Sequence, residues 1–194
     1  MSEDERIEAI LQAAYECFRV HGIRRTTMDD IARRAGMSRP AVYQYVRNKE
    51  DAFHRLADRL LRSTLAGFRA ELAAEGPLAR RLAAALGRKL GLVLRIHRES
   101  PPHAEELLGE SAQLTADLLQ EFDATLRQEL TAAVHQELPR ADAAEFAELL
   151  LALVRGLEKD VGADLPLRRL DHGVSMLVAG LLLTQQDPAH PAAG

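Results

Sequence analysis

The sequence predicts an all-α protein of about nine helices, in which a three-helix, helix-turn-helix domain precedes a larger helical domain. Hydrophobic residues make up 47% of the 194 residues but aromatic residues only 4%, which favours Ala- and Leu-rich helices packed on one another. Apolar residues recur at spacings of three and four along most of the chain, as on the buried face of a helix. Alternating β-branched segments closed by Asn-Gly or Asp-Gly turns are missing, so no strands are expected.

The first helix is expected to start near residue 7 and to end at His21 and Gly22. Its apolar residues fall at helical spacing: Ile7, Ile10, Leu11, Ala14 and Phe18. Cys17 lies on the same side, and as the only cysteine it leaves no intramolecular disulfide and no zinc-finger spacing. We expect a buried, inert thiol, with redox sensing as the alternative.

Two short helices joined by a tight turn are expected next. Thr27 suits the N-cap of the first, because its hydroxyl can accept from a backbone N–H near residues 29–30. That helix is expected to stop at Gly36, since glycine adopts the left-handed conformation of a sharp helix exit. Ser38 then caps the second helix, whose first turn accepts Pro40 because N–H groups there have no intrahelical partner.

One side of this second short helix is not needed for packing in the core. Val42 and Val46 can anchor the helix, which leaves exposed Arg39, Pro40, Ala41, Tyr43, Gln44 and Tyr45. Such a helix can enter a major groove and present side chains to base edges and phosphates. Asn48 next caps a long helix and places Lys49 and free N–H groups where a phosphate could lie. We interpret the segment as a helix-turn-helix that binds DNA; the alternative is an ordinary helical hairpin.

Residues 7–53 resemble the DNA-binding domain of the TetR family of bacterial regulators. The resemblance rests on the opening amphipathic helix and on G-I-R-R-T-T-M-D-D-I-A-R-R-A-G-M-S-R-P-A-V-Y-Q-Y-V-R-N-K-E-D-A-F. It implies phosphate contacts for Thr27, Tyr43 and Lys49, each of which carries a suitable donor. Arg39 and Gln44 are the expected base-reading residues, since Arg pairs with guanine and Gln with adenine.

The other residues expected at the DNA are Ser38, Pro40, Ala41 and Tyr45. Pro40 and Ala41 could touch a thymine methyl group, while Tyr45 could contact DNA or pack inward. Charge agrees with this placement, because residues 18–49 hold eight Arg and Lys against two Asp, a local charge of +6. Since the whole chain carries −4, the remainder carries −10. A basic module on an acidic body is typical of a nucleic-acid-binding domain joined to another domain.

Further helices are expected at residues 48–74, 78–97, 103–110, 111–138, 142–161 and 167–185. Gly87 and Gly91 are expected to interrupt the second of these and to let neighbours approach closely. The predicted domains are residues 1–50, which bind DNA, and residues 51–186, which bind ligand and dimerise. The Pro- and Ala-rich tail, residues 187–194, is expected to be disordered.

A single helix-turn-helix contacts only one half-site, so a homodimer on a palindromic double-stranded operator is expected. The last two helices are the expected contact, as a four-helix bundle about a two-fold axis. Gly156, Ala179 and Gly180 would permit close crossings there. The alternative is that the same apolar faces are simply the monomer's own core.

The resemblance also implies a small-molecule effector enclosed by the middle helices. A ligand that prefers the wrong separation of the two DNA-binding domains would shift the population away from DNA, and repression is the family's commoner mode. Polar candidates on otherwise apolar helices are His97, His103, Glu110, Gln113, Glu158 and His172. For each alone, a solvated or hydrogen-bonded structural role is the alternative. The Leu- and Ala-rich lining predicts a mostly hydrophobic ligand.

Other function classes find little support. The histidines lack H-x-x-x-H and H-E-x-x-H spacings and no Gly-rich phosphate loop occurs, so neither an enzyme nor a bound metal or cofactor is expected. A ligand-independent, DNA-bound structural or partner-recruiting protein on the same scaffold remains the alternative. The charged start is unlike a signal peptide, and the longest uncharged run, residues 172–186, is short for a membrane span. A cytoplasmic protein without membrane contact is expected.

Overall fold

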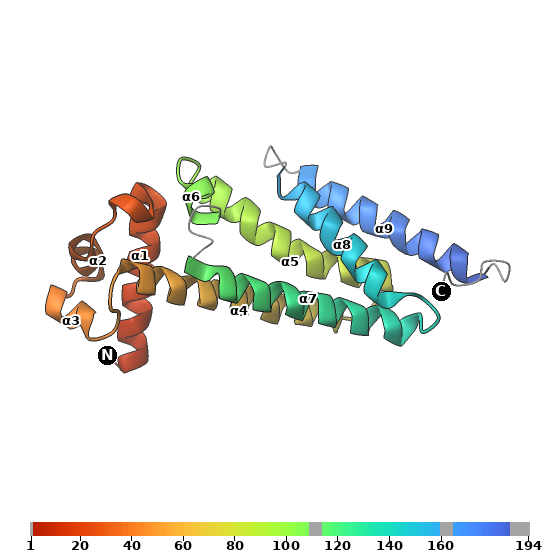
Figure 1. Cartoon of the computed structure of the whole chain (residues 1–194), viewed down its shortest axis with the longest axis horizontal. Coiled ribbons are helices and arrows are strands. Elements are labelled where there is room, and N and C mark those ends of the chain that lie inside the picture. The colour runs from red at the N-terminus through yellow and green to blue at the C-terminus, as the bar shows by residue number, and fades with distance from the viewer. Residues whose placement is uncertain (1, 109–113, 160–164, 187–194) are drawn as a thin grey trace. The chain divides into compact units, whose positions relative to one another are not determined.

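The computed structural model describes residues 2–108, 114–159 and 165–186 of the chain. Within these residues it contains nine α-helices and no strand, which confirms the predicted all-α fold (Figure 1). The helices are α1 Glu3–Arg25, α2 Met28–Ala35, α3 Arg39–Tyr43, α4 Lys49–Leu72, α5 Leu78–Glu99, α6 Ala104–Leu108, α7 Ala116–Glu137, α8 Ala143–Leu157 and α9 Leu165–Gln186.

The chain folds as two compact units. Unit 1 comprises Met1–Ser63 and Arg95–Gln120, and unit 2 comprises Thr64–Leu94 and Glu121–Gly194. The helices α4, α5 and α7 therefore each pass from one unit into the other. The division of roles between residues 1–50 and residues 51–186 stays a prediction, and the predicted tail lies outside the described residues.

In unit 1, α1 is capped at its start and broken near its end. Ser2 and Glu5 form a reciprocal capping box, in which each side chain accepts from the other residue's backbone N–H. Gly22 adopts φ 74° and ψ 167°, a non-helical conformation inside α1. The helix thus breaks where the sequence predicted its end, and the last segment of α1, up to Arg25, leads on to α2.

The caps predicted around α2 and α3 are confirmed. The Thr27 hydroxyl accepts from the Asp30 N–H at 3.2 Å, and Gly36 closes α2 in the left-handed conformation with φ 66°. Ser38 Oγ accepts from the Ala41 N–H at 3.4 Å, and Pro40 lies in the first turn of α3. The helix-turn-helix is therefore closed by local hydrogen bonds at both of its junctions.

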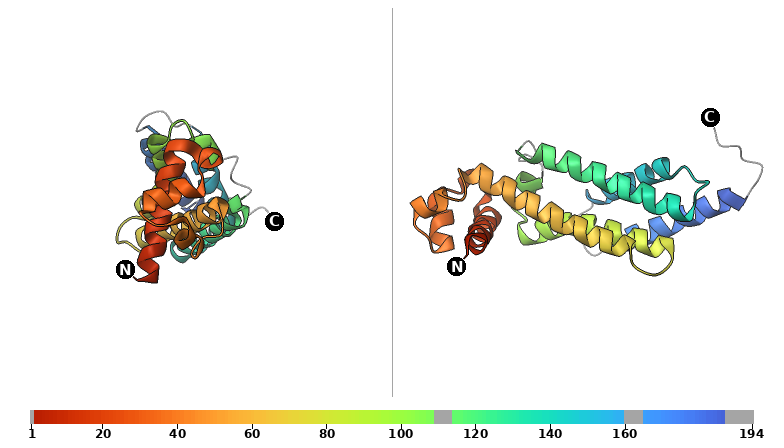
Figure 2. Two further views of the ribbon diagram at one scale, coloured as in Figure 1. Left: turned by 90° about the vertical axis from the view of Figure 1, so that its left-hand side faces the viewer. Right: turned by 90° about the horizontal axis from the view of Figure 1, so that it is seen from below.

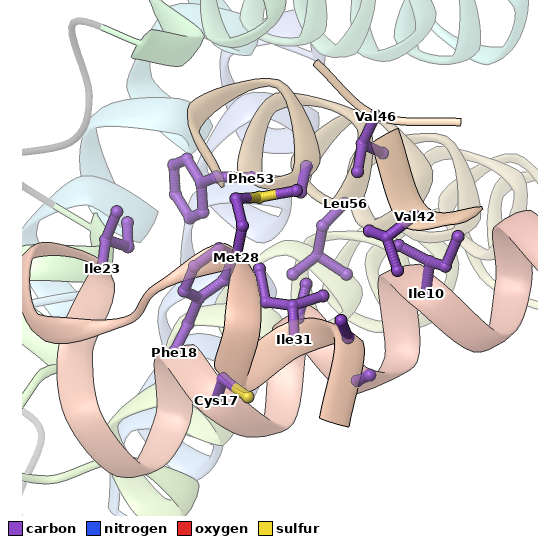
Figure 3. Packing of buried hydrophobic residues seen from close by; sticks show 14 residues of the cluster. Ile10, Cys17, Phe18, Ile23, Met28, Ile31, Val42, Val46, Phe53 and Leu56 are labelled. Atoms are coloured by element: carbon purple, nitrogen blue, oxygen red, sulfur yellow. The ribbon is translucent and has the colours of Figure 1, made fainter. Parts of the chain in front are cut away.

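The core of unit 1 joins α1, α2, α3 and the start of α4 (Figure 3). Phe18 and Ile31 are fully buried, and the Phe18 and Phe53 rings meet edge to face with centroids 5.8 Å apart. Cys17 is buried in the same cluster, and burial raises the pKa of its thiol, which favours the unreactive protonated form. This agrees with the inert role expected for it.

Unit 2 is a bundle built from the second half of α4, the first part of α5, and α7, α8 and α9. In this unit α4 lies alongside α7 (Figure 2), with Arg69 Nε 2.7 Å from Glu129 Oε1, and α8 packs on α9. Its core is formed by leucines and other apolar residues that are almost wholly buried: Leu82, Leu86, Leu90, Leu126, Leu130, Leu150, Val154, Leu170 and Val174. No described helix is both long and apolar enough to cross a membrane.

Two details of the helices differ from expectation. α5 runs unbroken through Gly87 and Gly91, because a helix tolerates single glycines at a cost of about 1 kcal/mol each. A Cβ at Gly87 would lie 4.0 Å from Leu167, an ordinary contact, and one at Gly91 would meet nothing within 4 Å, so neither marks a close approach. The second difference is that α7 begins at Ala116, whereas the predicted helix 111–138 also included residues 114 and 115. Residues 111–113 of that prediction lie outside the described residues.

Candidate nucleic-acid interface

The short helix α3 is held to the core of unit 1 by one side only. Val42 and Val46 are 0% and 1% exposed and pack in the cluster of Figure 3. Arg39, Pro40 and Gln44 are exposed, and Ala41 is half-buried. The anchored side fixes the helix, so that its opposite side can present side chains to a groove.

Arg39 and Tyr43 lie together on this exposed side. The Arg39 guanidinium is 5.5 Å from the centre of the Tyr43 ring, and its Nη1 lies 3.3 Å from a carboxylate oxygen of Asp29. The hydrogen bond to Tyr43 and the charge of Asp29 raise the pKa of Arg39 further, so it remains a cation. Because Asp29 already pairs with Arg39, an anion that bound Arg39 would have to replace the Asp29 carboxylate.

Tyr45 lies apart from this group. It is half-buried against the core of unit 1, and its hydroxyl accepts from Arg6 Nη1 at 3.2 Å. Tyr45 thus packs on the core, and its contact with DNA stays a prediction. Arg6 is a contact that sequence spacing alone did not indicate, because it lies 39 residues away.

Thr27 is exposed at the start of α2 and completes a capping box with Asp30. Its hydroxyl donates to Asp30 Oδ2 at 2.6 Å and accepts from the Asp30 N–H at 3.2 Å. Hydrogen bonds from the Thr27 hydroxyl and N–H lower the pKa of Asp30, whose charge suits the positive end of the helix. Thr27 therefore has a structural role whatever it contacts on DNA.

Lys49 is half-buried and makes two hydrogen bonds within the chain. Its Nζ donates to the carbonyl of Ile23 at 2.8 Å and to that of Arg24 at 2.9 Å. Both carbonyls belong to the last segment of α1, after the break at Gly22. The ammonium group thus fastens the start of α4 to the backbone of residues 23 and 24. The sequence predicted a phosphate contact for Lys49 but did not indicate this structural role.

Asp51 is a further residue that sequence analysis missed. Partial burial alone would raise the pKa of its carboxyl, but hydrogen bonds from the Arg47 N–H, the Arg47 guanidinium and the Arg55 guanidinium outweigh it, and the pKa is lowered. The Arg–Asp–Arg spacing of four on either side was the available signal. The cluster joins the end of the helix-turn-helix to α4.

Comparisons with known proteins agree with this geometry. Residues 10–56 match the family model described as bacterial regulatory proteins, tetR family. Residues 10–56 therefore form a DNA-binding domain of the tetR-family type. The matched residues include the whole helix-turn-helix and the start of α4, so the predicted resemblance is confirmed over that segment.

Solved structures also match beyond this segment. A TetR transcription regulator from Haloarcula marismortui matches with a TM-score of 0.70 at 22% identity, over 92% of this chain and 98% of that one. The fatty acid degradation regulator FadR from Bacillus halodurans matches with a TM-score of 0.71 at 17% identity, over 93% and 98%. SmeT in complex with triclosan matches with a TM-score of 0.66 at 20% identity, over 98% and 100%. At these identities the matches show the fold alone, which this chain shares with them over most of its length.

The residues predicted to line an effector pocket fall in different parts of the chain. In unit 1, His97 is half-buried and His103 Nε2 lies 3.2 Å from the carbonyl of Val20. In unit 2, Glu158 accepts from Lys89 Nζ at 2.7 Å, and His172 is exposed on α9. The remaining two candidates, Glu110 and Gln113, lie outside the described residues. Among the described residues, no cluster of three or more His, Cys, Asp or Glu side chains could hold a metal ion.

Proposed function

We propose that this protein is a dimeric TetR-family transcriptional repressor that a small, mostly hydrophobic ligand releases from its operator. The observation that carries the proposal is the free side of α3. Arg39, Pro40 and Tyr43 are exposed there, while Val42 and Val46 anchor the helix to the core. The exposed side chains are therefore held on a fixed helix and are not needed for core packing. A rigid helix with donors and aromatic side chains on its free side suits a major groove.

The proposed DNA contacts follow from this surface. Arg39 and Gln44 read bases, Pro40 and Ala41 meet a thymine methyl group, and Tyr43 donates to a phosphate. Arg39 is already held at 5.5 Å from the Tyr43 ring, which limits the number of conformations that it loses on binding.

The N-terminal ends of the helices supply the remaining proposed contacts. Thr27 and Ser38 lie at the starts of α2 and α3, where backbone N–H groups attract anions. Lys49 lies at the start of α4 and can offer its remaining proton to a phosphate. Tyr45 supports the site from within unit 1, because it packs on the core there.

The proposed dimer contact lies on α8 and α9. These helices expose large apolar side chains, with Met176 62% and Leu183 67% exposed in the single chain, and also Leu149, Leu165, Leu167 and Leu182. Beside them, Gly156 and Gly180 have nothing within 4 Å of where a Cβ would stand. An apolar strip with small residues along it is suited to a second copy of the same helices, which could then approach closely.

The proposed ligand response uses helices that the two units share. The helix α4 has residues 49–63 in unit 1 and residues 64–72 in unit 2, and we propose that it transmits the ligand response. Similarity to SmeT, which was solved with triclosan, supports a hydrophobic small-molecule effector. Within unit 2 the mostly buried pair of Lys89 and Glu158 would provide polar groups for orientation.

The test combines mass and DNA binding. Wild-type protein should have twice the mass of one chain by light scattering and should protect palindromic sites in genomic footprinting. Met176→Asp should give a monomer with weakened operator binding. Leu119→Asp also places an aspartate at an exposed apolar position, but on α7; it is the matched control and should remain dimeric. A monomeric wild-type chain, or one that protects no double-stranded fragment at low salt, would refute the proposal.

The effector is tested separately by a thermal-shift screen of metabolites and drugs, followed by DNA titration with each stabilising compound. Release from the operator supports the repressor described above. A screen without any stabilising compound, together with intact operator binding, would instead favour a ligand-independent structural or partner-recruiting protein.

A further inference from the structure

A segment far from the helix-turn-helix in sequence lies against the end of α1. We refer to residues 99–107, which comprise the end of α5, the turn after it and most of α6, as the strap, and to residues 22–27 as the turn. The strap belongs to unit 1 together with α1 and packs on it (Figure 1). It lies entirely outside residues 10–56, which match the family model.

The strap supplies hydrogen-bond partners to the end of α1. A helix end leaves its last carbonyls without intrahelical donors. Ser100, which is 2% exposed, donates its hydroxyl to the carbonyl of Arg19 at 2.8 Å. His103 Nε2 lies 3.2 Å from the carbonyl of Val20. Two carbonyls in the last regular turn of α1 are thus bonded to strap side chains.

Contacts run in the other direction as well. Arg19 Nη1 donates to the carbonyl of Glu99 at 3.3 Å, and the Tyr15 hydroxyl donates to the Glu99 carboxylate. Partial burial and this hydrogen bond raise the pKa of Tyr15 to about 12, so the phenol keeps the proton that it donates. Leu107 adds an apolar contact with the core of unit 1, and Ala104 is buried.

Glu106 contacts the turn itself. Its Oε1 accepts from the Arg24 N–H at 2.8 Å. Gly22, two residues earlier, has φ 74°, and a Cβ there would lie 2.3 Å from Glu106 Oε2 and 3.0 Å from His103 Nδ1. In this structure the carboxylate occupies the space that a Cβ at residue 22 would need. Glu106 therefore makes a steric contact at Gly22 and a hydrogen bond to the backbone of Arg24.

The turn is the part of unit 1 that presents exposed basic residues beside the helix-turn-helix. Arg24 and Arg25 have exposed side chains, and Thr27 follows them at the start of α2. Inside the turn, Thr26 donates to the carbonyl of Gly22 at 2.6 Å. Lys49 bonds the carbonyls of the turn, and Glu106 bonds an N–H of it. The turn is therefore fastened from both α4 and the strap.

We propose that Glu106, seated against Gly22, is a positioning residue that orders the turn so that its basic side chains can contact the DNA backbone. The inference rests on the DNA binding proposed above. By this inference the strap contributes to DNA binding, although it lies some forty residues after the helix-turn-helix segment in the chain. Because the strap continues directly from α5, any change that lifts it off α1 loosens the turn and weakens contact with every DNA sequence alike.

The test uses the full-length protein and two readouts, amide hydrogen exchange of residues 22–27 without DNA and affinity for a nonspecific duplex at low salt. Glu106→Ala should speed exchange in the turn by roughly tenfold or more and weaken duplex binding roughly threefold. Glu106→Gln keeps an acceptor for the Arg24 N–H and should restore most of both properties.

A second set of variants tests the steric fit. Gly22→Ala should loosen the turn further, and part of its effect should vanish when combined with Glu106→Ala, because the colliding carboxylate is then gone. Gly36→Ala is the matched control: its φ of 66° is similar, but a Cβ there meets nothing within 4 Å, so exchange in the turn should be unchanged.

The outcomes separate this inference from the proposed function. Unchanged exchange in residues 22–27 of Glu106→Ala would overturn the positioning role even if the wild-type protein binds DNA well. Faster exchange together with unchanged duplex affinity would overturn its link to DNA. If the wild-type protein bound no duplex at all, the proposed function would fail, and the link to DNA would fail with it, while the exchange data would still decide whether Glu106 orders the turn.

Discussion

The two hydrogen bonds of Lys49 lead to a prediction that separates its two possible roles. Lys49→Gln removes the ammonium group that bonds the carbonyls of Ile23 and Arg24. A hydrogen bond from a charged donor contributes about 1.5–3 kcal/mol. The bond to Arg24 is exposed and is discounted for solvent, whereas the bond to Ile23 is partly buried. We expect unit 1 to lose about 2 kcal/mol of its free energy of unfolding.

The assay uses the aromatic composition of the chain. It has no Trp and three Tyr, and Tyr15, Tyr43 and Tyr45 all lie in unit 1. Tyrosine fluorescence during urea unfolding therefore reports on unit 1, while far-UV circular dichroism reports on all helices. Lys49→Gln should lower the urea midpoint of the tyrosine signal. The matched control is Lys159→Gln, at an exposed lysine just after α8, and it should change the free energy of unfolding of unit 1 by less than about 0.5 kcal/mol.

DNA titration completes the comparison. A lysine that also contacts phosphate should lose affinity for all sequences, and the slope of log affinity against log salt should fall by about 0.9. If Lys49→Gln weakened DNA binding but left the tyrosine midpoint unchanged, the fastening of the turn by Lys49 would be refuted. An unchanged salt slope with a lowered midpoint would instead remove the phosphate contact.

Three further predictions follow from the same unit. Arg39→Ala should cost about 1–3 kcal/mol of binding at one base pair, measured with operator variants, and should barely change stability, since the Arg39 and Asp29 side chains are more than half exposed. Val42→Ala removes two methyl groups from a fully buried side chain and should cost about 2 kcal/mol by tyrosine-monitored unfolding. Asp51 has a lowered pKa in the folded chain, so its contribution is present at neutral pH and is lost as the pH falls below about 4 through the folded-state pKa. Asp51→Asn should thus destabilise unit 1 by about 1 kcal/mol at pH 7, and the difference from wild type should shrink in acid; a constant difference across this range would contradict the assignment.

Local signals in the sequence determined the helix-turn-helix almost completely. Thr27, Gly36 and Ser38 each act through bonds to residues within four positions, so their capping roles follow from residue type and spacing. The burial of Val42 and Val46 follows from the spacing of four on one helix face. For the same reason the free side of α3 was predictable, because it is what remains once the anchoring positions are assigned.

The partners of polar side chains were less predictable where they come from distant parts of the chain. Tyr45 was left between DNA contact and inward packing, and its bond with Arg6, 39 residues away, was not indicated by the sequence. Glu158 was a pocket candidate by its place on an apolar helix, and in the structure it pairs with Lys89, 69 residues away. No spacing rule links such positions, because they meet only when separate helices pack.

The sequence by itself determined the helices, their caps, the basic segment and the exposed side of α3, since these depend on hydrogen bonds and side-chain periodicity within a few residues. Only the tertiary structure decided that Lys49 and Glu106 both bond the backbone of residues 23 and 24, after the break in α1. The physical reason is that a broken helix end leaves carbonyl and N–H groups in need of partners, and chain packing, rather than sequence distance, sets which side chains can reach them.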